Sequence, residues 1–241
     1  LQVAERYPAT PLREVGTYAP GRTDGVTPTH NARMAAWGPG LGRAFAFALR
    51  GGESNGAGGK FEAPPARLPS GRSTTGTAIY LNVDKATRAW EDFAITSRLA
   101  REGLIDKQHV SSTPRGVAIH EGVHAVAYHG RPQQPEEAVG ARARELALAN
   151  AERTGAVEKL RDQVRRGLTT QEEADRWLRV GVTRQFVAGN VSVYASTDHA
   201  ELTAEALADV ILNGDDATTL SRELARVADE NIRGFERVAG R

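Results

Sequence analysis

The chain contains no cysteine among its 241 residues. This absence excludes disulfide bonds, thiolate metal ligands and a cysteine nucleophile, so any metal site must use histidine and carboxylate side chains. Aromatic residues are scarce, at 6%, and the formal net charge is only +1. Neither extensive base stacking nor a broad positive field is therefore available, and we expect no nucleic-acid partner.

Long apolar runs are also missing. No window approaches the roughly 18 continuous apolar residues of a transmembrane helix, so we expect no membrane span. Residues 1–5 lack the basic start and apolar run of a signal peptide, and there is no initiator Met. We therefore expect a processed product or a part of something longer. Its location stays open.

Local patterns divide the chain into two parts. Residues 1–72 are rich in Pro, Gly and Thr, which predicts an irregular accessory segment that includes a half-buried strand over 43–49. The strongest strand prediction covers 77–83, and the pattern after it is helical almost throughout. Helices are predicted over 84–102, 113–128, 135–153, 155–166, 170–180, 198–213 and 216–238. We expect an α+β fold, in which a small N-terminal sheet with an edge strand precedes a mostly helical body, and a main domain at 73–241.

One motif carries most of the chemical information. Residues 120–124 read His-Glu-Gly-Val-His in an apolar stretch, and a Thr-Pro pair at 113–114 predicts the start of the helix that holds them. Positions i and i+4 share one helix face, so the imidazoles of His120 and His124 can bind one zinc ion. Glu121 lies beside the open side of such a metal and can take a proton from water there.

The alternative for this motif is a surface helix that carries the pattern by chance. The apolar flanks, Val117 to Ile119 and Val123 to Ala127, instead predict a buried helix. Two histidines and a glutamate on a buried helix need polar partners or a metal. We therefore expect a metal site.

A catalytic zinc ion typically has three protein ligands and one open coordination position. The downstream extension that adds a third histidine in one type of such site would need His at position 130, which is Gly130. His129 is five residues past His124 and points off the binding face of a regular helix. Glu201 and Glu205 lie one turn apart on a helix predicted over 198–213. We expect Glu201 to be the third ligand and Glu205 to orient a histidine ligand.

A plainer role for Glu201 also fits the sequence. If Asp198 is the N-cap, Glu201 occupies the third helical position, where a capping carboxylate is common. The upstream histidine pair and the second carboxylate one turn on favour the ligand role. Asp198 and His199 are weaker ligand candidates.

These motifs resemble the gluzincin-type metallopeptidase domains of the anthrax lethal factor group and their relatives in bacterial toxins and phage head-associated proteins. The resemblance covers roughly residues 75–212. Its features are His120-Glu121-x-x-His124, the Ser192-x-Tyr194-Ala195 segment and Glu201-x-x-x-Glu205-Ala206. It implies a zincin-like fold, a Zn²⁺ cofactor, Glu201 as the third ligand, and Tyr194 as a donor to the oxyanion or leaving group. The alternative for Tyr194, without the resemblance, is a half-buried aromatic that precedes a helix.

The resemblance also implies an activity, zinc-dependent hydrolysis of peptide bonds in a protein or peptide substrate, as in a toxin or effector. In such domains an edge strand before the metal helix binds extended substrate by β-augmentation, which assigns substrate binding here to Ile79, Tyr80 and Leu81. The chain departs from the family at Leu202-Thr203, where aromatic residues are usual.

A second hypothesis comes from the phage relatives. The chain would be a structural or delivered component of a phage-like particle or secretion assembly, with a structural or vestigial zinc site. A fourth protein ligand favours this role, whereas an open position next to Tyr194 favours catalysis.

Overall fold

The computed structural model describes residues 2–7, 12–18, 46–50, 66–67, 73–74, 77–82, 88–111, 113–127 and 134–239. The α-helices are α1 (Gln2–Arg6), α3 (Arg88–Arg101), α4 (Pro114–Ala127), α5 (Gln134–Arg153), α6 (Ala156–Arg165), α7 (Gln171–Arg176), α8 (Val182–Asn190), α9 (His199–Asn213) and α10 (Thr219–Ala239). Between them lie the π-helical turn η2 (Trp177–Gly181) and the 3₁₀ turns η3 (Tyr194–Ser196) and η4 (Gly214–Asp216).

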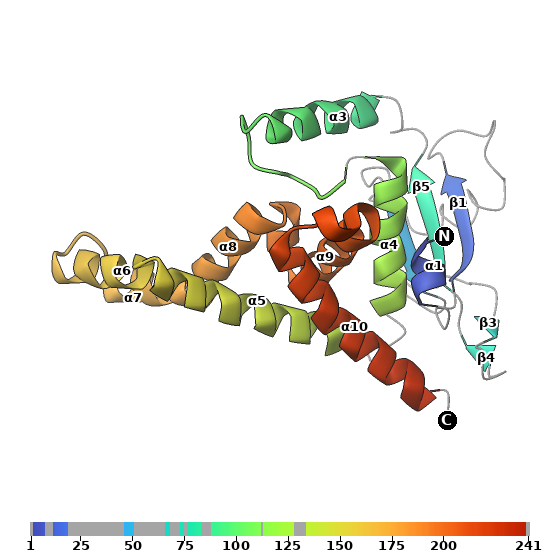
Figure 1. Cartoon of the computed structure of the whole chain (residues 1–241). Coiled ribbons are helices and arrows are strands. Elements are labelled where there is room, and N and C mark those ends of the chain that lie inside the picture. Colours follow the sequence, from blue (N-terminus) through green and yellow to red (C-terminus); the bar gives the residue numbers. More distant parts are fainter. Residues whose placement is uncertain are drawn as a thin grey trace, which may run out of the picture.

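The strands are β1 (Leu12–Tyr18), β2 (Ala46–Arg50), β3 (Ala66–Arg67), β4 (Ser73–Thr74) and β5 (Thr77–Asn82). β5 pairs in parallel with β1 and antiparallel with β2, while β3 and β4 form a separate ribbon. β2 and β5 lie against α4. Figure 1 shows this strand region at one side of the helices.

The expected α+β fold class, with a zincin-like N-terminal sheet, is wrong. Most of the described residues are helical. The main core is built by α1, α4, α5, α8, α9 and α10 with their connections, and it does not include the buried Ile79 of β5. The physical reason is that the repeated apolar stripes that bury a core lie on the helices, whereas the alternation near the N-terminus extends over only a few residues.

The expected edge strand is also absent at 77–83. β5 lies between β1 and β2, so both of its backbone edges are already paired. Ile79 is fully buried. Residues Ile79, Tyr80 and Leu81 therefore cannot receive an extended peptide by β-augmentation.

Helix α9 is the centre of the core. Its residues from Leu202 to Asp209 are all buried, and it packs on α4, α5 and α10. α10 presents Leu220, Leu224, Ala228 and Ile232, which are four residues apart and form one apolar stripe. The predicted helices over 135–153, 155–166, 198–213 and 216–238 are confirmed to within three residues at their ends.

The N-terminal helix belongs to this core. Val3 and Tyr7 are fully buried among the core helices. Tyr7 donates a hydrogen bond to Asp229 of α10, and the Arg6 guanidinium lies 2.6 Å from the same carboxylate. Residues 2–7, expected in an accessory segment, therefore help to fix α10.

Truncation of a core side chain should cost much of the stability. Leu224 is fully buried between helices, so Leu224→Ala should lower the free energy of unfolding by about 2–5 kcal/mol in a urea titration. Leu168→Ala is the matched control, because Leu168 is 64% exposed and its truncation should change stability by less than about 0.5 kcal/mol. Equal losses in the two variants would contradict this core.

Candidate metal centre

Helix α4 carries both histidines of the motif. Thr113 is its N-cap, as predicted: the Thr113 Oγ1 accepts the Gly116 N–H at 3.1 Å, and Pro114 is the first helical residue. The predicted end at Tyr128 lies outside the described residues. Because the apolar side of α4 is buried in the core, His120 and His124, one turn apart, are buried as well, at 8% and 7% exposure.

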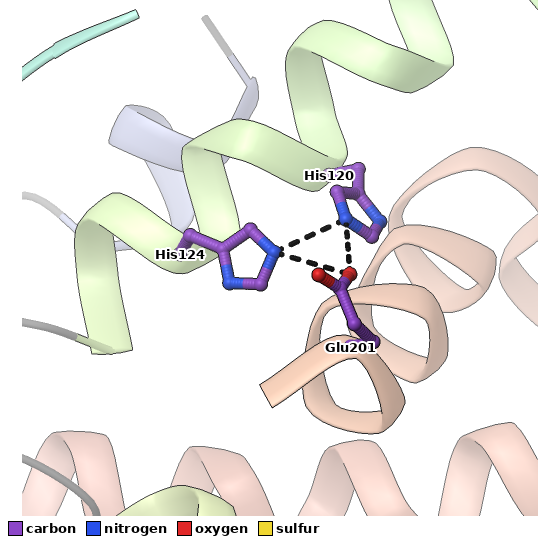
Figure 2. Close-up of side chains that lie close together, drawn as sticks. All are labelled: His120, His124 and Glu201. Carbon is purple, nitrogen blue, oxygen red and sulfur yellow. Dashed lines mark hydrogen bonds and ion pairs between the residues drawn. The ribbon is translucent and has the colours of Figure 1, made fainter. Parts of the chain in front are cut away.

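Helix α9 carries the two carboxylates. The Asp198 side chain is the N-cap and accepts the Glu201 N–H at 2.9 Å. The Glu201 side chain itself reaches toward the imidazoles of α4 (Figure 2). The structure thus gives the capping function to Asp198 and brings the Glu201 carboxylate to the histidines.

Three ligand atoms converge at one point. The His120 Nε2 lies 2.9 Å from the Glu201 Oε2 and 3.1 Å from the His124 Nε2, and the His124 Nε2 lies 3.4 Å from the same Glu201 oxygen. In a tetrahedral zinc site with bonds of about 2.0–2.1 Å, ligand atoms are about 3.3 Å apart. The spacing of these three atoms therefore fits a single small cation.

The tautomer of His120 supports the same conclusion. Its Nδ1 lies 3.1 Å from the Glu205 Oε1, so the ring donates its Nδ1–H to this carboxylate. The Nε2 atom then faces the second imidazole and the Glu201 oxygen, and in the absence of a metal it carries a proton, because the two carboxylates raise the pKa of His120 to about 10. A metal ion would replace this proton between the three atoms, so the donor set fits a metal ion.

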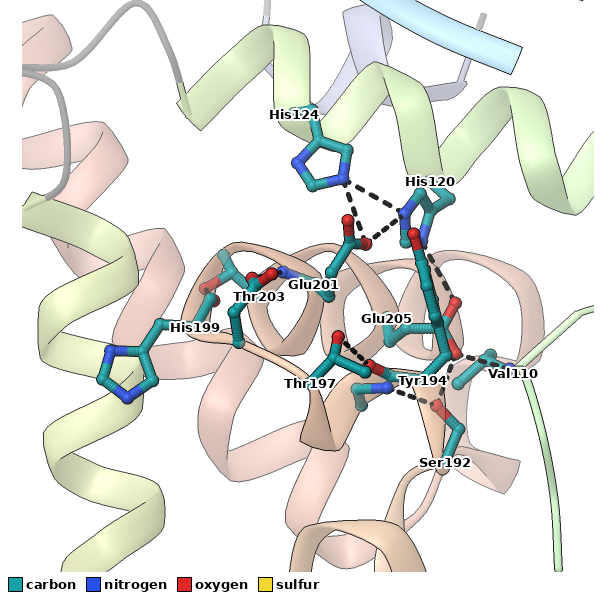
Figure 3. A network of polar contacts seen from close by, with 12 residues as sticks. Val110, His120, His124, Ser192, Tyr194, Thr197, His199, Glu201, Thr203 and Glu205 are labelled. Atoms are coloured by element: carbon teal, nitrogen blue, oxygen red, sulfur yellow. Dashed lines mark hydrogen bonds and ion pairs between the residues drawn. The ribbon is translucent and has the colours of Figure 1, made fainter. Parts of the chain in front are cut away.

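Glu205 is itself held by a small network. Its Oε2 accepts the Val110 N–H at 2.6 Å and the Ser192 hydroxyl at 2.7 Å, and the Ser192 Oγ accepts the Ala195 N–H at 3.0 Å. Figure 3 shows this chain of contacts below His120. Glu205 is only 4% exposed, so its position and charge are set by these fixed donors.

The electrostatics of the site follow from this arrangement. Burial lowers the pKa of His120, but its hydrogen bonds to Glu201 and Glu205 outweigh burial and raise the pKa to about 10. Burial raises the pKa of Glu201, but its contacts with His120 and His124 bring that pKa well below the usual range. Burial also raises the pKa of Glu205, but its hydrogen bonds, above all the one to His120, lower that pKa overall. The two carboxylates therefore favour positive charge at His120, which a divalent cation also supplies.

Tyr194 lies next to the three ligand atoms. Its N–H donates to the Gln108 carbonyl at 3.0 Å, and its ring centroid is 5.8 Å from that of His120 and 4.7 Å from that of His109. Burial and the negative charge of Glu201 raise the pKa of the Tyr194 phenol, so the phenol stays protonated and able to donate.

Glu121 is the residue after the first histidine and is half-buried. Its negative charge adds to the rise in the pKa of both His120 and Tyr194, so the carboxylate lies near both groups. These are the neighbours expected of a base that acts at the same metal centre.

The weaker ligand candidates do not join the site. Asp198 caps α9, and the His199 ring points away from the histidine pair (Figure 3). His199 packs on Gly140 of α5, where a Cβ atom would lie 2.5 Å from the ring. His129 lies outside the described residues.

Sequence reasoning missed three parts of this site. His109 and Val110 lie before α4 with no spacing that marks them, and the Val110 contribution is a backbone N–H that any residue carries. Ser192 was noted only as part of a motif, and its hydrogen bond to Glu205 has no local signature.

Comparisons with protein-family models, with curated proteins and with solved structures find no match for this chain. The function of the site therefore has to follow from its own chemistry.

The support of His120 by Glu205 can be measured directly. The amide of Glu205→Gln lacks the negative charge that strengthens the hydrogen bond from the His120 Nδ1–H. It also has only one oxygen, so its NH₂ group must face at least one of the donors that now point at the carboxylate. Zinc affinity, measured by competition with a chromophoric chelator, should fall about 10–100-fold. Glu152→Gln on the exposed side of α5 removes the same charge and should leave the affinity unchanged. An unchanged affinity in Glu205→Gln would refute this support.

Proposed function

We propose that this chain is a zinc-dependent endopeptidase whose metal is held by His120, His124 and Glu201. The observation that carries the proposal is the convergence of two imidazole nitrogens and one carboxylate oxygen within 3.4 Å, with the proton of His120 directed to Glu205. When bound, zinc supplies a Lewis acid that polarises a carbonyl group and lowers the pKa of water to about 7.

Zinc suits this donor set. Nitrogen and carboxylate ligands are those of catalytic zinc sites, and the chain has no thiolate to offer. Within the described part of the chain, the cluster provides three ligand atoms from His120, His124 and Glu201. Three protein ligands are typical of a catalytic site, whereas structural zinc sites have four. This count favours the enzyme over a structural component of a phage-like particle.

Two residues supply the proton chemistry in this proposal. Glu121 takes a proton from the attacking water and passes it to the leaving amine, which suits a half-buried carboxylate beside His120. Tyr194 donates its phenol hydrogen to the oxygen that becomes negative as the peptide carbonyl is attacked. Its raised pKa keeps that hydrogen in place at neutral pH, and the Gln108 carbonyl and the His109 ring hold it in position.

The substrate in this proposal is a protein or peptide. On the basis of the motif resemblance, the chain in this proposal is a secreted or delivered effector, or a part of a larger toxin or phage-like assembly. The described helices include none that is both long and apolar enough to cross a membrane.

Removal of the base should separate chemistry from metal binding. Glu121→Gln should lower the rate of peptide hydrolysis about 10²–10⁴-fold while the protein keeps one zinc ion per chain. The rates are measured by mass spectrometry on a peptide library with zinc-loaded protein, and zinc by atomic absorption. Glu172→Gln, an exposed carboxylate on α7, is the control and should keep full activity. The enzymatic proposal fails if the zinc-loaded wild type cleaves no peptide, or if Glu121→Gln cleaves as fast as the wild type.

The phenol of Tyr194 should act in the transition state rather than in binding. Tyr194→Phe removes one donor and should lower kcat about 10–1000-fold, with KM and zinc content little changed. A rise in KM alone, with kcat intact, would show instead that Tyr194 only binds substrate.

A further inference from the structure

A separate pocket of about 430 Å³ lies between one face of α5, the η2–α8 segment and residues 195–202. Its wall includes His199, whose ring points away from the histidine pair (Figure 3), and none of His120, His124 and Glu201. The volume is in the range of sites that bind small molecules.

Three arginines from different elements line this pocket: Arg144 of α5, Arg179 of η2 and Arg184 of α8. Over the described residues, none of the three is engaged in an ion pair or a side-chain hydrogen bond. The neighbouring Arg142, by contrast, pairs with two carboxylates. All three residues are exposed, and several unpaired guanidinium groups around one cavity favour an anionic ligand.

Two carboxylates also belong to the wall, Glu137 and Asp198. Asp198 is engaged, because its Oδ1 accepts the Glu201 N–H as the cap of α9. The three arginines outnumber these two acids, so the wall carries an excess of positive charge.

A buried hydroxyl in the same wall lacks a partner. Thr183 Oγ1 is buried, and the described part of the chain offers it no hydrogen bond. Buried polar atoms nearly always have a partner, and one without is explained by a water molecule, an ion or a ligand. Because this oxygen has almost no exposed surface, the Thr183 side chain must turn about its Cα–Cβ bond to bring the hydroxyl to an anion in the pocket, where it would donate a hydrogen bond.

The helix turn before Thr183 is also unusual. In η2 the Val182 N–H donates to the Trp177 carbonyl five residues back, and Gly181 is needed because a Cβ there would lie 2.7 Å from the Trp177 ring. Such π-helical turns are rare and occur frequently at functional sites. Here the turn lies between Arg179 and Thr183, two residues of the pocket wall.

The remaining wall is largely apolar. Ala141, Val180 and Val187 line the pocket, and Val180 is 48% exposed. We propose that this pocket binds a small organic anion, a carboxylate or phosphate group on a short apolar body. The charged group contacts the arginines and the Thr183 hydroxyl, and the body covers Val180.

Calorimetric titration of the whole chain tests this site. Hexyl phosphate and hexanoate should bind saturably, inorganic phosphate more weakly, and the uncharged hexanol should show no binding; the two charged probes distinguish a phosphate source from a carboxylate source. The double variant Arg179→Gln/Arg184→Gln should weaken binding of the preferred probe at least about 10-fold, and Thr183→Val should weaken it several-fold. The control Arg161→Gln/Arg165→Gln on α6 removes the same charge and should bind like the wild type.

Each titration is repeated in His124→Ala, which disrupts the metal centre, so that the outcome is separable from the proposed peptidase activity. Binding that disappears in this variant belongs to the metal centre and overturns the proposal. So does equal binding of hexanol and hexanoate, no saturable binding at millimolar probe, or wild-type affinity in the Arg179/Arg184 double variant. Circular dichroism of each variant verifies that the fold is intact.

Discussion

The hydrogen bond from His120 to Glu205 organises the candidate metal centre. It joins α4 to α9 through two buried polar groups, and it turns the Nε2 atom of the imidazole toward the Glu201 carboxylate and the second histidine. Without it, the His120 ring could rotate or change tautomer, and its Nε2 would no longer face the other two ligand atoms. The rest of the site depends on this one contact.

The contact is fixed from outside by the core. Glu205 lies on a helix that is buried from Leu202 to Asp209, so its carboxylate cannot move toward solvent. The Val110 N–H and the Ser192 hydroxyl occupy its second oxygen, and the Val193 N–H donates to the Lys107 carbonyl at 2.8 Å, so the segments before α4 and before α9 are joined to each other. The same segments hold Tyr194 beside the ligand atoms, so one network sets both the metal ligands and the candidate donor.

Helix α9 serves two sites on its two sides. Glu201 and Glu205 face α4, whereas Asp198 and His199 at its start face α5 and the arginine-lined pocket. The close approach of His199 to α5 requires the missing side chain of Gly140. A single helix N-terminus thus separates a cluster that favours a cation from a pocket that favours an anion.

The sequence by itself determined the local features. The N-cap at Thr113, the helix that follows and the common face of His120 and His124 follow from helix geometry, which needs only neighbouring residues. The amphipathic pattern of α10 likewise appears in the order of its residues. The helix α8 was not predicted, because Gly181 and the β-branched Val182-Thr183 pair lower helix propensity, and packing on α5 overrides this.

Only the tertiary structure decided what lies next to the histidines. Glu201 and Glu205 are 81 and 85 residues from His120 in the chain, and Val110 is 95 residues from Glu205. The tertiary structure also decided that both edges of β5 are paired, which excludes the expected substrate-binding role of this strand, and that three arginines line one pocket. The physical reason is that spacing along a helix is a local property of the backbone, whereas the meeting of distant side chains depends on how whole helices bury their apolar faces against each other.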